Sequence, residues 1–163
     1  MSLSSVGAGD LAGAAPDRPA RAGFLGDPGW WALGAVGLAA DLALRLAVPA
    51  ALAGSALRGV GPWVSCVLLQ PVLEEFAFRG LLQGELLRAR WGRWRLGPLS
   101  AANCSASLAF AALHFGHHPP FWAASVFLPS LVFGWLRERH RGVAAPIGMH
   151  VLYNLEFFLA ASL

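Results

Sequence analysis

The chain has 163 residues, of which 56% are hydrophobic and 13% are charged, and its mean hydropathy of +0.56 excludes an ordinary soluble domain. A helix that crosses the hydrocarbon of a bilayer needs roughly 20 mostly apolar residues, so this length supplies about five spans. The net charge is +3, but every basic residue is an arginine and most lie in two short stretches between apolar segments. Such stretches indicate membrane topology and argue against nucleic-acid binding.

Residues 1–28 form a leader that is rich in Gly, Ala, Pro and Ser and contains no long apolar run. We predict that it is disordered and is not a signal peptide. Its Gly7-Ala8-Gly9-Asp10 matches the GxGD pattern of intramembrane aspartyl proteases, but that aspartate works within a membrane helix, so we interpret the match as coincidence. Residues 29–163 are predicted to form one membrane-embedded domain.

Five apolar segments follow the leader and are predicted to be helices: Trp30 to Ala53, Val60 to Leu82, Leu96 to Gly116, Phe121 to Leu136 and Val143 to Ala161. Pro129 is expected to kink the fourth. Leucines and tryptophans alternate with arginines over residues 83–95, a pattern that predicts an interfacial amphipathic helix. The predicted fold class is therefore all-α, a polytopic transmembrane bundle of about five spans plus one interfacial helix.

The arginines also predict the orientation of the bundle. The leader holds two, and the successive loops hold one, four, none and three. This alternation predicts a multi-pass protein with a cytoplasmic N-terminus and an external C-terminus. The absence of lysine beside abundant Ala and Arg is compatible with a GC-rich bacterial genome, so the expected location is a bacterial inner membrane. Cys66 and Cys104 lie within apolar stretches, and we infer no disulfide.

Ionisable side chains inside a bilayer are costly, which makes those of the second apolar segment functional candidates. Glu75 and Arg79 are four residues apart with the acid first, the favoured arrangement for an ion pair on one helix face. Glu74 has no local partner. Because neighbouring helical residues point about 100° apart, Glu74 can face a polar cavity while Glu75 is neutralised. This division suits Glu74 as a general base.

Two later segments carry matching polar groups. A partly polar stripe follows one face of the third segment, where the residues at helical spacing are Asn103, Ser107, Phe110 and His114. In the fifth segment, His150 and Asn154 are four apart and share a face. An imidazole and a carboxamide on one face can donate hydrogen bonds to a developing oxyanion. Three helices therefore offer a base, a proton carrier and oxyanion donors.

These groups resemble the EExxxR, FxxxH and HxxxN motifs of the CAAX-protease and bacteriocin-processing family of intramembrane glutamic endopeptidases, in the same order and spacing. The run Phe133-Gly134-Trp135-Leu136 is similar to the family's fourth, glycine-containing element. The resemblance covers roughly residues 60–160. It implies a helical membrane protease domain within residues 29–163 and hydrolysis of a peptide bond in a membrane-anchored protein or peptide, without a covalent intermediate.

The resemblance also implies roles for individual residues. Glu74 and His114 would activate the water, and His150 and Asn154 would stabilise the oxyanion. Glu75, Arg79 and Phe110 would support them. No cofactor is expected, the lipid bilayer and the substrate are the expected partners, and the oligomeric state stays open.

Three other interpretations remain open. The acid pair and Arg79 could be a structural ion-pair knot between helices. His114 and His118 are four apart and could chelate zinc with Glu74 in a metal-dependent protease, although no HExxH occurs. The same buried groups could also serve a non-catalytic membrane protein of immunity or transport, because transporters commonly contain them.

The predicted segments raise one geometric difficulty. His114 falls near the external end of its segment, whereas Glu74 falls past the middle of its own toward the cytoplasm. At a rise of about 1.5 Å per residue, the vertical gap is about 10 to 15 Å, too large for both to act on one water. Either the third helix starts later, near Ala101, or tilt and a re-entrant kink bring the two groups level.

Overall fold

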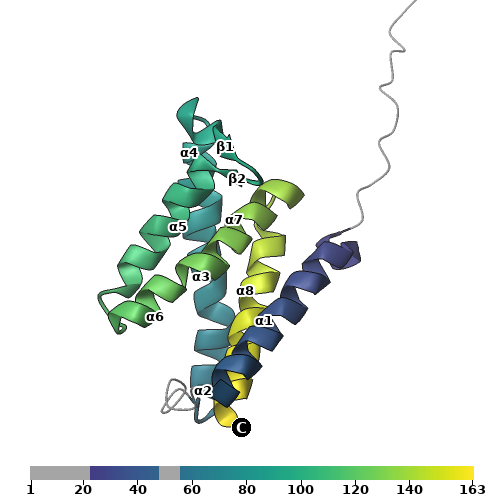
Figure 1. The fold of residues 1–163 in the computed structure, drawn as a ribbon, viewed down its shortest axis with the longest axis vertical. Coiled ribbons are helices and arrows are strands. Elements are labelled where there is room, and N and C mark those ends of the chain that lie inside the picture. Colours follow the sequence, from purple (N-terminus) through teal and green to yellow (C-terminus); the bar gives the residue numbers. More distant parts are fainter. Residues whose placement is uncertain (1–22, 48–55) are drawn as a thin grey trace, which may run out of the picture.

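The structure is a computed structural model that describes residues 23–47 and 56–163. Its helices are α1 (Pro28–Ala47), α2 (Val60–Trp63), α3 (Gln70–Glu75), α4 (Gln83–Leu86), α5 (Ala101–His114), α6 (Pro120–Ser125), α7 (Phe127–His140) and α8 (Ala144–Ser162). Short 3₁₀ turns occupy Phe24–Gly26 and Trp91–Arg93, and β1 (Arg95–Leu96) pairs with β2 (Leu99–Ser100). Over this part of the chain the predicted all-α class is confirmed apart from the one small hairpin (Figure 1). The GxGD match lies outside the described residues, as do residues 1–22 of the leader and the end of the first apolar segment.

Residues 60–86 form one continuous helix, in which two π-helical stretches, Val64–Leu69 and Phe76–Leu82, separate α2, α3 and α4. Proline explains the first stretch. Pro71 has no N–H and its ring would clash with the preceding turn of a regular α-helix. The widened turn before it absorbs that clash, because the Gln70 N–H bonds to the Ser65 carbonyl five residues back. The acid pair follows at the end of α3.

The predicted interfacial helix over residues 83–95 is wrong. The long helix ends at Leu86, and the chain then turns into the β1–β2 hairpin. Two glycines explain the change. A side chain on Gly92 would come within 1.9 Å of the Leu86 carbonyl oxygen, and Gly97 has a φ of 59°, which favours glycine. The alternation of Leu, Trp and Arg therefore belongs to a tight fold-back at the end of the bundle.

Helix α5 begins at Ala101, later than the apolar segment that starts at Leu96. The Ser100 side chain caps it by accepting a hydrogen bond of 3.0 Å from the Asn103 N–H. The fourth apolar segment is divided into α6 and α7, and the break falls at Val126 instead of a kink at Pro129. Proline is tolerated in the first turn of α7 because its missing N–H has no partner there.

Helices α5 and α7 approach closely at Gly134. A Cβ atom there would lie 1.9 Å from the Asn103 side-chain oxygen. Asn103 is fully buried and is held by two hydrogen bonds, from its Nδ2 to the Leu131 carbonyl at 3.0 Å and to its Oδ1 from the Ser107 hydroxyl at 3.1 Å. It therefore cannot withdraw without leaving polar atoms unpaired.

Gly134→Ala is expected to lower the free energy of unfolding by about 1 to 3 kcal/mol, the usual cost of overpacking a dense core. Unfolding in mixed detergent micelles measures the change. Gly84→Ala is the matched control, because its new methyl would meet only atoms at 4.0 Å and alanine favours the helix. Equal stability of the two variants would contradict the close contact between α5 and Gly134.

Helix α1 packs on α8, and the end of the leader packs with it. The Trp30 indole donates to the Ala145 carbonyl at 3.1 Å, and Phe24 packs on Trp30 with ring centroids 5.4 Å apart. Asp27 forms an ion pair with Arg139 at 2.7 Å, and this guanidinium holds the pKa of Asp27 below its usual value. Residues 24–27, which the sequence placed in the leader, are thus folded onto the bundle.

Among the described helices, α1 alone is long and apolar enough by itself to cross a membrane, with a mean hydropathy of 1.3. By length and hydropathy alone, the described helices therefore support one membrane crossing, formed by α1. Figure 1 shows the start of α1, the hairpin and the α7–α8 turn at one end of the bundle, with α2 and the C-terminus at the other. The two arginine-rich connections thus lie at the same end of the bundle.

Candidate active site

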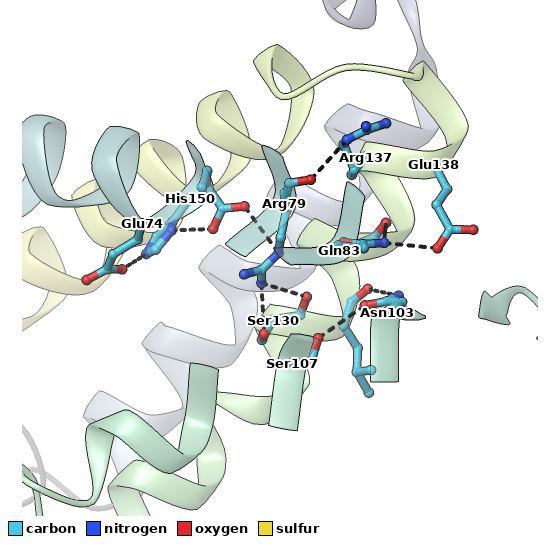
Figure 2. Close-up of polar contacts among 12 residues, drawn as sticks. Glu74, Arg79, Gln83, Asn103, Ser107, Ser130, Arg137, Glu138 and His150 are labelled. Atoms are coloured by element: carbon cyan, nitrogen blue, oxygen red, sulfur yellow. Dashed lines mark hydrogen bonds and ion pairs between the residues drawn. The ribbon is translucent and has the colours of Figure 1, made fainter. Parts of the chain in front are cut away.

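A continuous line of polar contacts in the interior of the bundle joins the long helix (residues 60–86) to α7 and α8. Figure 2 shows Glu74 beside His150, with Arg79 and Ser130 farther along the same line. Glu74 comes from the end of α3, Arg79 from the second π-helical stretch, Ser130 from α7 and His150 from α8. Glu75 links His150 to Arg79. Residues predicted from separate motifs are therefore adjacent in space.

His150 lies between the two acids. Its Nδ1 is 2.9 Å from the Glu75 Oε1 atom, and its Nε2 is 3.7 Å from the Glu74 Oε2 atom. Because an ionised Glu75 can only accept, Nδ1 carries the hydrogen of the shorter contact. The Phe133 ring stacks on the imidazole at 4.6 Å with an interplanar angle of 18°. The imidazole is thus fixed so that its Nε2 faces Glu74.

Arg79 is fully buried and anchors Glu75. Its Nε lies 3.3 Å from the Glu75 Oε2 atom, an ion pair with poor hydrogen-bond geometry in which charge attraction dominates. One terminal nitrogen donates to both the hydroxyl and the carbonyl oxygen of Ser130, at 2.8 and 3.0 Å. The guanidinium carbon also lies 5.1 to 5.9 Å from the centroids of three aromatic rings, those of Phe78, Phe110 and Phe133. These rings favour the buried positive charge.

The structure resolves the vertical gap between Glu74 and His114. The Phe78 and Phe110 rings meet edge to face at 5.1 Å, and α5 runs antiparallel to the long helix (Figure 1). One further turn toward the same end of the bundle leads from Phe78 to Glu74 and from Phe110 to His114. The His150 Nε2 atom lies 3.7 Å from the Glu74 carboxylate, and this register brings His114 to the same level of the bundle. The later start of α5 is thus the explanation.

His114 is held in a defined tautomer. Its Nδ1 lies 2.8 Å from the Phe110 carbonyl oxygen, which can only accept, so Nδ1 carries the hydrogen and the neutral ring keeps its lone pair on Nε2. The Phe110 ring packs against it at 4.6 Å. His118, in the turn after α5, stacks on the His114 ring at 5.7 Å. These contacts hold the His114 ring in place.

Asn154 has a structural partner that the HxxxN pattern does not indicate. Its side-chain nitrogen donates to the Cys66 carbonyl oxygen at 2.7 Å. In the π-helical pattern the Cys66 carbonyl would need the N–H of Pro71, which does not exist. Asn154 satisfies that orphaned oxygen and fastens α8 to the long helix. A carboxamide nitrogen carries two hydrogens, so one donor remains for another acceptor.

Within residues 23–47 and 56–163, no three or more His, Cys, Asp or Glu side chains are grouped so that they could hold a metal ion. Glu74, His114 and His118 therefore do not form a ligand set in this conformation. Zinc dependence stays a hypothesis to be tested in solution.

The network extends beyond the residues that the motifs indicate. Gln83 is fully buried and donates to the Gly134 carbonyl at 3.0 Å and to Glu138 at 2.9 Å, as Figure 2 shows. Ser130 is also absent from the predicted site residues. For Ser130 the only signal in the sequence is a polar side chain inside an apolar segment. Gln83 directly follows such a segment, and the partners of both residues lie 51 residues or more away.

Ser130→Ala removes the hydroxyl but leaves the backbone carbonyl in contact with Arg79. The expected result is a loss of about 1.5 to 3 kcal/mol in the free energy of unfolding, because the lost bond is to a charged donor. Unfolding in detergent micelles measures it. Ser125→Ala is the control, since that hydroxyl donates only to the Trp122 carbonyl within its own helix. A Ser130 variant no less stable than the control would show that Arg79 does not depend on the hydroxyl.

The comparison with known proteins places this cluster in a family. Residues 56–155, more than half of the chain, match the family described as type II CAAX prenyl endopeptidase Rce1-like. Curated proteins and solved structures give no match. The matched region runs from before α2 into α8 and includes every residue of the cluster, whereas α1 lies outside it. As the motifs predict, the chain belongs to the Rce1-like family of type II CAAX prenyl endopeptidases, a family of membrane-embedded proteases.

Proposed function

We propose that the protein is an intramembrane endopeptidase in which Glu74 and His114 activate a water molecule to hydrolyse a peptide bond. Membership of a protease family supports peptide hydrolysis in general. The observation that carries the glutamate mechanism is the contact of the Glu74 carboxylate with the oriented His150 imidazole, whose Nε2 lies 3.7 Å from it. A base and a potential donor for an oxyanion thus border the same space.

In the proposed reaction, the Glu74 carboxylate takes a proton from water as the water oxygen attacks the carbonyl carbon of the peptide bond. His114 accepts a hydrogen bond from the water through its Nε2 lone pair. The tetrahedral intermediate carries a negative oxygen, to which a protonated His150 and the second N–H of Asn154 donate. The C–N bond then breaks, and the proton on Glu74 passes to the leaving amine.

Glu75 and Arg79 support this sequence without taking part in bond making. The Glu75 Oε1 atom accepts the hydrogen on Nδ1 and so holds the His150 ring in place. Arg79 pairs with the other oxygen of Glu75 and fixes this carboxylate. The stacked Phe133 ring sets the plane of the imidazole. Each of these contacts orients a donor before the substrate arrives.

The proposed substrate is a membrane-associated protein or peptide. We also propose five membrane crossings, formed by α1, the long helix, α5, α6 with α7, and α8, with the arginine-rich end in the cytoplasm. Helices α5 and α7 have 14 residues each, about 21 Å, so their crossings would need the adjoining segments or a thinner bilayer. A bacterial inner membrane is the proposed location.

The test is cleavage of synthetic peptides by the purified protein in lipid nanodiscs. One peptide ends in a farnesylated CAAX sequence, a second has the same sequence without the lipid, and mass spectrometry identifies the products. We expect cleavage that is unchanged by a metal chelator. Loss of activity with the chelator and stoichiometric bound zinc would support the metal-dependent alternative. A folded protein that cleaves neither peptide would contradict the proposal and favour a non-catalytic role.

A further inference from the structure

A second polar feature lies at the arginine-rich end of the bundle, away from the acid pair. An open cavity of about 410 Å³ is formed there by the chain after α4, the hairpin and the end of α7. Its lining residues are Leu87, Arg93, Arg95, Arg137, Glu138 and Arg141. Four cations and one anion therefore surround the same space.

Glu138, the one acid that lines the cavity, already has partners for both of its carboxylate oxygens. One oxygen of Glu138 accepts hydrogen bonds from Gln83 and from the Ser100 hydroxyl, and its other oxygen is paired with Arg95. Its side chain is only 9% exposed. Glu138 thus fixes the hairpin against α7 and neutralises one arginine, but it has no capacity left for the other three.

Among the described residues, no acid forms an ion pair with the three remaining arginines of the cavity. Arg93 and Arg141 are exposed, and within the described residues neither forms a hydrogen bond or an ion pair through its side chain. Arg137 donates its Nε to the Arg79 carbonyl at 3.2 Å, which leaves its two terminal nitrogens as further donors. Like charges that line one cavity repel one another, so an anion between them would stabilise the arrangement.

The dipole of α7 does not explain the cluster by itself. Cations near the last turn of a helix are favoured by the dipole, which accounts for Arg137 and Arg141. Arg93 and Arg95 come from the 3₁₀ turn and the hairpin strand, which are separate elements. The fold-back at Gly92 and Gly97 brings them to the same cavity. Convergence from independent elements is the feature of a binding site.

We propose that this cavity binds the phosphate group of an anionic phospholipid. The planar guanidinium of arginine forms two parallel hydrogen bonds with phosphate oxygens, and basic pockets at the cytoplasmic end of membrane helices accept lipid headgroups. Large apolar side chains that neighbour Arg93 and Arg95 in the sequence are exposed: Trp91 is 43% exposed, Trp94 is 70% exposed and Leu96 is 86% exposed. Tryptophan at this position is typical of the headgroup level of a bilayer, where a lipid and not only free phosphate is available.

The experiment compares two double variants, each of which removes two positive charges, by native mass spectrometry with phosphatidylglycerol and with phosphatidylcholine. The first variant, Arg93→Gln with Arg141→Asn, removes the two unpaired cations of the cavity. Asparagine is chosen because Arg141 has a φ of 56°, a conformation that asparagine tolerates. The second, Arg88→Gln with Arg90→Gln, removes the same net charge from the loop that follows α4, but neither residue lines the cavity.

The expected result is preferential binding of phosphatidylglycerol by the wild type and an affinity at least about tenfold lower in the cavity variant than in the control variant. Equal loss in the two variants would show a diffuse attraction to anionic lipid and overturn the proposal. A third arm adds inorganic phosphate. If it displaces phosphatidylglycerol when present at an equal concentration, the site is one for free phosphate, and the lipid assignment fails. None of these outcomes depends on peptidase activity.

Discussion

Glu74→Gln is expected to lower kcat for peptide cleavage by about 10²- to 10⁴-fold, the range for loss of a general base. The substitution keeps the size and shape of the side chain but removes the carboxylate that would take the proton from water. Glu74 is partly exposed and has no hydrogen bond within the described residues, so the fold should tolerate the change. The measurement is the rate of product formation in nanodiscs.

Two controls separate a catalytic effect from a general one. Glu85→Gln removes an acid from the same long helix, where Glu85 is exposed and contacts only Arg88. It should keep full activity. His114→Ala should instead reproduce much of the loss, because it removes the second group proposed to contact the water. Wild-type activity in Glu74→Gln would contradict the glutamate mechanism but would not affect the family assignment.

Much of the site could be predicted from the sequence because its constraints are local. The spacing of Glu75 and Arg79 places them on one face of any helix, and the structure contains their ion pair at 3.3 Å. The interval from Phe110 to His114 likewise predicts adjacent rings, found 4.6 Å apart. That such pairs from three apolar segments meet is not a local property. It followed from the resemblance to the family, and His150 between the two acids agrees with it.

The misplaced elements depend on interactions that a periodic pattern does not contain. The pattern over residues 83–95 resembles an amphipathic helix, but the chain folds back tightly at Gly92. There the Leu86 carbonyl oxygen occupies the space that a side chain on residue 92 would need. The π-helical stretch before Pro71 changes which carbonyl lacks a donor, and this decides the partner of Asn154. Ser130 gains its role from Arg79, 51 residues earlier in the chain. Each of these contacts can be predicted only after the neighbouring element has been placed in three dimensions.

Arg79→Met is expected to cause the largest loss of stability, about 3 to 5 kcal/mol in the free energy of unfolding, because it leaves the fully buried Glu75 carboxylate without its cation. Methionine retains most of the side-chain volume, so a cavity contributes little. Unfolding in mixed detergent micelles gives the free energy. Arg88→Met is the matched control, since the Arg88 and Glu85 side chains are 79% and 65% exposed and such a pair contributes about 0 to 1 kcal/mol.

The double variant Glu75→Gln with Arg79→Met separates structure from catalysis. Removing both charges at once abolishes the uncompensated carboxylate, so most of the lost stability should return. Cleavage should not return with it, because a neutral amide at position 75 no longer holds, by charge, the His150 donor to the oxyanion. If stability and activity recover together, the ion pair of Glu75 with Arg79 has only a structural role, and the orientation of His150 does not require the charge of Glu75. If stability returns and activity stays low, the buried ion pair acts on the reaction through His150.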